Sequence, residues 1–238
     1  MHPGTRYEHL ARLFDYPKSD YPLWVQSVYD LLAGTYVVAA ARIAELACIL
    51  PTEGEPFSQE ALDEVQEIFT RSFDVQAITT LAVGYLRFGD DYKRGELLVH
   101  LRREQKAVGV ECGSELPDHL PNVLRLLARW EDRELRREFV ESILFPAVEH
   151  MISEFDVRRT AARNELYRKH YRTLIVTSPE RGMMFRYPLE ALRDVLRADF
   201  DPERRPPDGS NDFLRGVRQE LEIEEKADFD ATRSPRPA

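Results

Sequence analysis

The chain has 238 residues, of which 43% are hydrophobic and 32% are charged. A chain of this length buries one sizeable core, so we expect a single domain followed by a tail. Lys and Arg number 33 against 42 Asp and Glu, which gives a formal net charge of −9. Such an acidic chain lacks the positive surface that phosphate backbones require, so we expect no nucleic-acid partner.

The cysteines, the N-terminus and the most apolar stretch indicate a protein of the cytoplasm. Cys48 and Cys112 lie far apart without a C-x-x-C motif, so neither a disulfide nor a zinc site is predicted, and we expect Cys48 to be a buried thiol. The first residues have no basic stretch followed by an apolar run, so we expect no secretory signal. Residues 31–50 are interrupted by Arg42 and Glu45, whereas a membrane span needs about 20 mostly apolar residues, so we expect no membrane insertion.

The spacing of apolar residues predicts an all-helical bundle, a single domain of about eight helices. Apolar residues recur every three or four positions nearly throughout, and the alternation typical of exposed strands is absent. Proline, glycine and capping residues mark the ends of the segments. The helices expected in the first half are 32–50, ended by Pro51; 59–71, capped by Ser58; and 75–88, capped by Asp74 and ended by Gly89.

The second half continues this pattern and then changes composition. The helices expected there are 97–108, ended by Gly109; 118–130; 135–155; 158–176; and one from Pro188 onward. Pro146 should kink the long helix that contains it. From Asp201 onward the chain carries five prolines, ten acidic residues and seven basic residues, so burial cannot offset the entropy of ordering. We therefore expect a helical domain over 1–200 and a disordered, flexible acidic tail over 201–238.

The signatures of catalysis and of metal binding are missing from the sequence. It contains no G-x-G-x-x-G, no phosphate-binding loop, no G-x-S-x-G and no H-E-x-x-H. None of the six histidines follows a glutamate by three residues, as a di-iron bundle would require. Glu96, His100 and Glu104 share one helical face, which we expect to be solvated rather than to bind a cation. We therefore expect a protein that is not an enzyme and has no metal site.

The segment Glu115-Leu116-Pro117-Asp118-His119-Leu120-Pro121 combines two prolines with polar residues. With Asp118 as the N-cap, Pro121 falls in the first turn of a helix, where no backbone donor is needed. We expect a rigid turn with exposed polar residues, in which His119 is neutral because it lies at the positive end of the helix. Two interpretations stay open: a recognition site, or only a stiff helix start, since Pro and Asp are common at any helix start.

A longer run of residues resembles a known family. The run Gly89-Asp90-Asp91-Tyr92-Lys93-Arg94-Gly95-Glu96-Leu97-Leu98-Val99-His100-Leu101, then Gly109 and the 115–121 segment with Leu124 and Leu127, is similar to the NarJ-type delta-subunit assembly chaperones of respiratory nitrate reductases. These chaperones belong to the TorD family of redox-enzyme maturation proteins. Residues 7–17 resemble the start of the same proteins. The likeness covers about the first 150 residues and is densest between 74 and 130.

The resemblance implies a cytoplasmic, all-helical chaperone for a molybdoenzyme. Such a protein binds the N-terminal leader of an apo catalytic subunit of the dimethyl sulfoxide reductase superfamily and assists molybdenum cofactor insertion before assembly or export. It holds no permanent cofactor and makes at most a transient contact with molybdopterin guanine dinucleotide on the client. The client is expected to be nitrate reductase-like, with enzymes acting on chlorate, selenate or another substrate left open. The client-binding candidates carried over by position are Tyr85, Gly89, Arg94, Gly95, Glu115, Pro117, Asp118, His119, Leu120 and Pro121.

The same resemblance implies a mode of binding. An amphipathic leader helix would dock its apolar face into a groove beside the 75–88 and 118–130 helices. An acidic receptor also suits a leader rich in Lys and Arg. The alternative function is a permanent helical adaptor subunit of a respiratory reductase complex.

Overall fold

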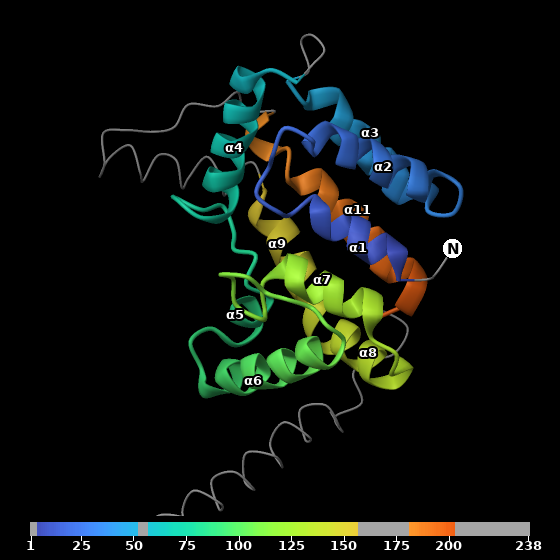
Figure 1. Cartoon of the computed structure of the whole chain (residues 1–238), viewed down its shortest axis with the longest axis vertical. Coiled ribbons are helices and arrows are strands. Elements are labelled where there is room, and N and C mark those ends of the chain that lie inside the picture. Colours follow the sequence, from blue (N-terminus) through green and yellow to red (C-terminus); the bar gives the residue numbers. More distant parts are fainter. Residues whose placement is uncertain (1–3, 52–56, 157–180, 203–238) are drawn as a thin grey trace, which may run out of the picture.

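The computed structural model describes residues 4–51, 57–156 and 181–202 (Figure 1). Regular structure in these ranges is helical, and an isolated antiparallel bridge joins Ala82 and His119. The all-helical class is therefore confirmed. The helices are α1 (Thr5–Arg12), α2 (Tyr21–Ala33), α3 (Val37–Ile49), α4 (Gln59–Phe73), α5 (Val83–Phe88), α6 (Tyr92–Ala107), α7 (Leu120–Arg129), α8 (Arg133–Phe139), α9 (Phe145–Glu154) and α11 (Arg186–Phe200), with a π-helical turn at Val140–Leu144 and a 3-10 turn at Arg181–Met183.

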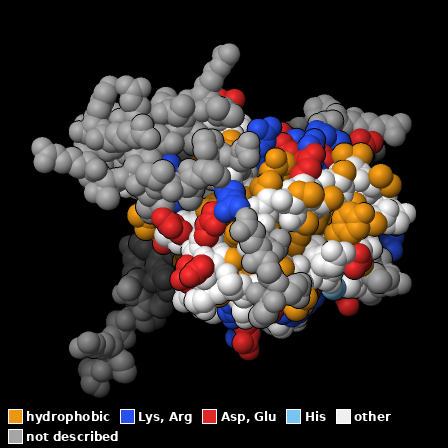
Figure 2. Space-filling model, turned by 90° about the horizontal axis from the view of Figure 1, so that it is seen from above, with side chains coloured by type: hydrophobic (Ala, Val, Ile, Leu, Met, Phe, Trp, Pro, Cys, Tyr) orange, Lys and Arg blue, Asp and Glu red, His pale blue; other side chains and the backbone are white. Residues whose placement is uncertain are grey.

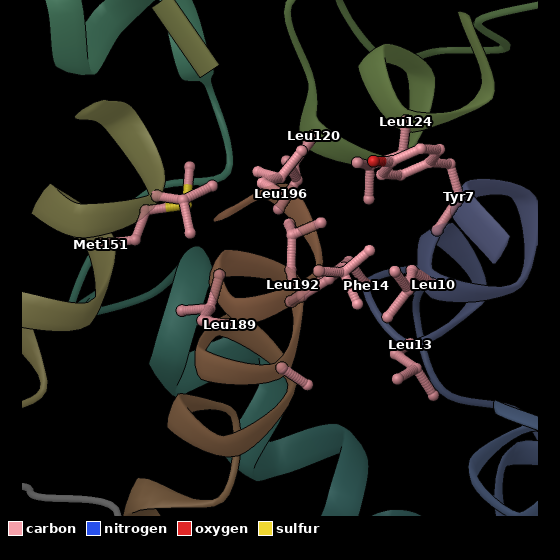
Figure 3. Packing of buried hydrophobic residues seen from close by; sticks show 14 of the residues in the cluster. Tyr7, Leu10, Leu13, Phe14, Leu120, Leu124, Met151, Leu189, Leu192 and Leu196 are labelled. Carbon is pink, nitrogen blue, oxygen red and sulfur yellow. The ribbon is translucent and has the colours of Figure 1, made fainter. Parts of the chain in front are cut away.

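Helix α11 lies in the middle of the fold. It packs against α3 and α9, while α1 packs against α2 and α7 (Figure 1). Leu189, Leu192 and Leu196 recur on one face of α11 at spacings of three and four, and all three side chains are buried. Figure 3 shows side chains of α1, α7, α9 and α11 meeting in this core, among them Leu10 and Met151. Burial of this shared apolar surface holds the helices together.

A polar cluster joins the C-terminal end of α11 to α1. The Asp199 carboxylate accepts hydrogen bonds from Arg6 Nε at 2.7 Å, from the Tyr7 hydroxyl and from the Tyr36 hydroxyl at 2.6 Å. Burial and the Asp199 carboxylate raise the pKa of Tyr36 to about 12, so its hydroxyl remains a donor at neutral pH. The cluster fixes the direction of α1 and thereby places the turn that follows it.

Several expected helix ends are confirmed. Ser58 caps α4, since its hydroxyl accepts a hydrogen bond from Ala61 N at 3.1 Å. Gly89 and Gly109 follow α5 and α6 with positive φ of 65° and 68°, as expected of glycines that end helices. Pro188 lies in the first turn of α11, which begins two residues earlier than expected.

Two of the expected helices of the first half are wrong in their extent. The 32–50 stripe is divided between α2 and α3, because the chain leaves the helix at Gly34 and resumes it only at Val37. The 75–88 helix begins only at Val83, and Asp74 ends α4 instead of capping a new helix. Ile78 N and Thr79 N donate to carbonyls at the end of α4, which folds this segment back as a connector.

The long 135–155 helix is interrupted before its proline. A π-helical turn separates α8 from α9, and Pro146 occupies the first turn of α9. Proline cannot donate to the carbonyl of Ser142, which instead accepts a hydrogen bond from Arg87 Nε at 3.2 Å. This bond links the loosened turn to α5.

The structure also bears on three remaining expectations. Cys48 is exposed and not buried, because it lies on the outer face of α3. No helix in the described ranges is long and apolar enough to cross a membrane. The helix expected over 158–176 and the part of the tail beyond Pro202 lie outside the described residues.

Candidate functional site

A cleft of about 850 Å³ lies where the turn after α1, the end of α4 and the loop before α7 come together. Its residues come from four stretches of chain that are distant in sequence, within 12–24, 69–74, 80–82 and 111–125. This volume is in the range of pockets that bury a small ligand or a few side chains of a peptide. It is the candidate site because the 115–121 segment forms part of its wall.

Two buried amides hold the loop over 110–119 in shape. Gln105 Nε2 donates to the Pro117 carbonyl at 2.8 Å, and Gln105 Oε1 accepts from Cys112 Sγ at 3.1 Å. Asn122 Nδ2 donates to the Leu116 carbonyl at 3.1 Å. Because these bonds satisfy loop carbonyls from inside the fold, the loop presents a fixed surface to the cleft.

The structure corrects the expected role of Asp118. Its side chain is fully buried rather than exposed, and the N-cap of α7 is His119, with Pro121 at the second helical position. The cause is the bridge to the connector: Leu120 N donates to Leu81 O at 2.8 Å, and Val83 N donates to Asp118 O at 2.9 Å. These bonds extend the backbone at 118–119, so the carboxylate faces α5 and α6 instead of the helix end.

The buried carboxylate forms a small network with two other candidate residues. Asp118 Oδ2 accepts a hydrogen bond from Arg94 Nε at 3.0 Å, and the Arg94 guanidinium lies 5.4 Å from the centre of the Tyr85 ring. Asp118 Oδ1 is buried without a hydrogen-bond partner among the described residues. A Cβ at Gly84 would lie 2.8 Å from Asp118 Oδ2, so the pair depends on glycine at that position.

The ten candidate residues therefore fall into two groups. Glu115, Asp118, His119 and Pro121 line the cleft. The others stand outside its lining: Tyr85, Gly89, Arg94, Gly95, Pro117 and Leu120. In this second group Arg94 and Tyr85 support the wall from behind, whereas Gly95 has no atom within 4 Å of where its Cβ would be.

His119 is a partly buried polar residue of the wall. Burial lowers its pKa, an effect that the carboxylates of Glu115, Asp15 and Asp118 oppose and Arg125 reinforces. The imidazole is thus neutral near pH 7, as expected, although burial is the leading cause rather than the helix end. A neutral imidazole offers one donor and one acceptor to a bound group.

The opposite wall consists of residues that the sequence patterns did not single out. Tyr16, in the turn after α1, packs edge-on against Phe69 of α4 at 5.6 Å, and Phe69 packs against Phe73 at 5.1 Å. Asp15 pairs with Arg125 of α7, which ties this turn to the helix that follows the loop. The i, i+4 spacing of Phe69 and Phe73 was the one local signal of a shared aromatic face.

The cleft has an excess of negative charge. Six of its lining residues are acidic and three, apart from His119, are basic. Asp74, Glu111 and Glu115 are exposed carboxylates that form no ion pair within the part of the chain that the structure describes. No group of three or more His, Cys, Asp or Glu in these ranges could hold a metal ion. The excess of carboxylates in its lining suits the cleft to a cationic group.

No model of a protein family matches the chain, and no curated protein matches it either. A functional assignment therefore depends on the cleft and on the sequence resemblance.

Proposed function

We propose that the protein is a cytoplasmic, system-specific chaperone. It holds the N-terminal leader of an apo molybdoenzyme catalytic subunit, nitrate reductase-like and of the dimethyl sulfoxide reductase superfamily, while the molybdenum cofactor is inserted. The observation that carries this proposal is the position of the 115–121 turn. The segment with the most distinctive family resemblance is also a wall of the cleft.

The chemistry of the cleft supports a peptide as the occupant. Aromatic residues on one wall suit the apolar face of an amphipathic helix, and the exposed carboxylates suit its Lys and Arg residues. The neutral His119 adds a directional hydrogen bond. The cleft that would receive the leader is bounded by α4, the turn after α1 and the start of α7, and not by a helix over 75–88.

The proposed action is binding alone. The protein would shield the leader from premature assembly or export and would hold no cofactor of its own. Its contact with molybdopterin guanine dinucleotide would be transient and would occur on the client.

Capture of the client before and after maturation tests this function. The tagged full chain is incubated with the catalytic subunit prepared without molybdenum cofactor and, separately, with the mature cofactor-loaded enzyme. We expect capture of the apo subunit and release of that subunit by excess synthetic leader peptide. Stable co-purification with the mature complex would favour the adaptor instead, and capture of neither form would contradict the proposal.

A further inference from the structure

We infer that the cleft recognises two adjacent features of its occupant, a large apolar side chain held between Tyr16 and Leu116 and a Lys or Arg facing Asp74, Glu111 and Glu115. The inference rests on the proposed function for the natural occupant, a protein leader, and names the residues that determine which leader fits. Neither Tyr16 nor Leu116 belongs to the ten residues that the sequence resemblance selected.

Two large apolar side chains, Tyr16 and Leu116, are exposed inside the cleft. Tyr16 is 53% exposed and Leu116 is 48% exposed, and both line the cleft from different stretches of chain. Tyr16 is backed by the ring of Phe69, and the backbone of Leu116 is fixed by Asn122. Two large apolar side chains that line one hollow surface bury well against a third that enters between them.

The cationic half comes from carboxylates that the fold leaves unmatched. Asp15 and Asp118 already pair with Arg125 and Arg94. Asp74, Glu111 and Glu115 have no such partner in the described ranges and remain exposed at the cleft. Asp118 lies in the lining of the same cleft, and its buried Oδ1 has no hydrogen-bond partner among the described residues.

These observations favour a peptide over other occupants. A fatty acid or a phosphate would bring a negative charge to a wall that already carries excess carboxylate. The volume of about 850 Å³ admits several side chains of a peptide but not a folded domain. The occupant is therefore a short segment with Lys or Arg beside Leu or Phe.

The chain offers matched controls outside the cleft. Leu23 on α2 is 72% exposed and Val37 on α3 is 70% exposed, more than either cleft residue, and neither lines the cleft. Figure 2 shows hydrophobic side chains exposed among charged ones on the face seen from above. Non-specific hydrophobic binding of a peptide would depend on such residues as much as on Tyr16 and Leu116.

Fluorescence titration of the full chain with three labelled synthetic peptides tests the inference. The parent peptide contains Leu and Arg, the second has Arg replaced by Glu, and the third has Leu replaced by Ser. We expect the parent to bind and each altered peptide to lose about tenfold or more in affinity. No binding of the parent, or equal binding of all three peptides, would overturn the inference.

Variants of the protein locate the effect. Tyr16→Ser and Leu116→Ser should each weaken binding of the parent peptide about tenfold, while Leu23→Ser and Val37→Ser should stay within about twofold of the wild type. Thermal unfolding verifies that each variant is folded. If Tyr16→Ser does not fold, Leu116→Ser tests the apolar contact on its own. Equal losses in cleft and control variants would overturn the inference.

The two proposals fail separately. A molybdoenzyme leader that does not bind, while the parent peptide does, would remove the proposed function and leave the inference standing. A leader that binds Tyr16→Ser and Leu116→Ser as tightly as it binds the wild type would overturn the inference and leave the proposed function standing.

Discussion

The Asp118 carboxylate is buried, and its partner Arg94 has only 17% of its side chain exposed. Arg94 also lies 4.0 Å from Asp90, whose side chain is 88% exposed. Removing one member of a buried pair leaves the other uncompensated, whereas an exposed ion pair contributes little. The two aspartates thus share one arginine but differ in their environment.

We expect Asp118→Asn to lower the free energy of unfolding by about 1 to 3 kcal/mol, because Arg94 loses its buried counter-charge. Asp90→Asn should change it by less than about 0.5 kcal/mol. Urea denaturation of both variants measures the difference. Equal effects would show that the buried pair contributes no more than the exposed one.

Protonation of His119 should make the free energy of unfolding depend on pH. Its pKa in the folded protein is lowered from the ordinary value of 6.5, chiefly by burial. The unfolded chain then binds the proton more readily, so stability is fully present above about pH 6.5 and decreases as the pH falls toward the folded pKa. The free energy of unfolding of the wild type should therefore fall more between about pH 7.5 and 5.5 than that of His119→Gln. Parallel pH profiles for the two proteins would contradict the assigned burial effect.

At the scale of elements, two glycines on neighbouring helices have opposite roles. Gly84 in α5 faces the buried pair, where a Cβ would also lie 3.0 Å from Leu97 Cδ2, whereas Gly95 in α6 has open space around it. We expect Gly84→Ala to destabilise the fold, because the Asp118 side chain must move. Gly95→Ala should stabilise it by about 0.5 to 1 kcal/mol through higher helix propensity.

Thermal unfolding of the two glycine variants checks this pair. The affinity of the same variants for the leader peptide is then measured. Because Gly95 lies outside the lining of the cleft, Gly95→Ala should leave this affinity unchanged. A stable Gly84→Ala protein would mean that the packing around Asp118 adapts without cost.

Local signals predicted those helix ends that depend on local physics. Ser58 caps because its hydroxyl meets the nearby Ala61 amide, and Gly89 ends α5 because it adopts a positive φ. The connector after α4 was not predictable in this way. Asp74 is followed by apolar residues at helical spacing, but backbone bonds to α4 and to the 118–120 backbone determine the conformation there.

The candidate site could likewise be predicted only in part, because local patterns connect only residues that are close in sequence. The 115–121 turn was identified because its prolines and polar residues are contiguous in sequence. Tyr16 and Phe69 meet only in the folded chain, so no local pattern connects them to that turn. The burial of Asp118 depends on Arg94, 24 residues away, which helix-capping rules do not include.

At the scale of the whole molecule, the cleft exists because distant segments are held against one another. Asp199 at the end of α11 fixes α1, and Asp15 after α1 pairs with Arg125 of α7. Buried residues of α1, α4 and α11 belong to one core, and the end of α4, the turn after α1 and the loop over 110–119 line the same cleft. A preformed site of this kind binds without the cost of assembling its walls.

Titration calorimetry at several temperatures tests the central claim that this cleft binds a leader through apolar contacts assisted by charge. The full chain is titrated with a synthetic peptide that copies the first residues of the molybdoenzyme catalytic subunit. We expect a clearly negative heat-capacity change, as burial of apolar surface requires, and binding that weakens but persists at high salt. A heat-capacity change near zero with binding abolished by salt, or no binding by a folded protein, would contradict it.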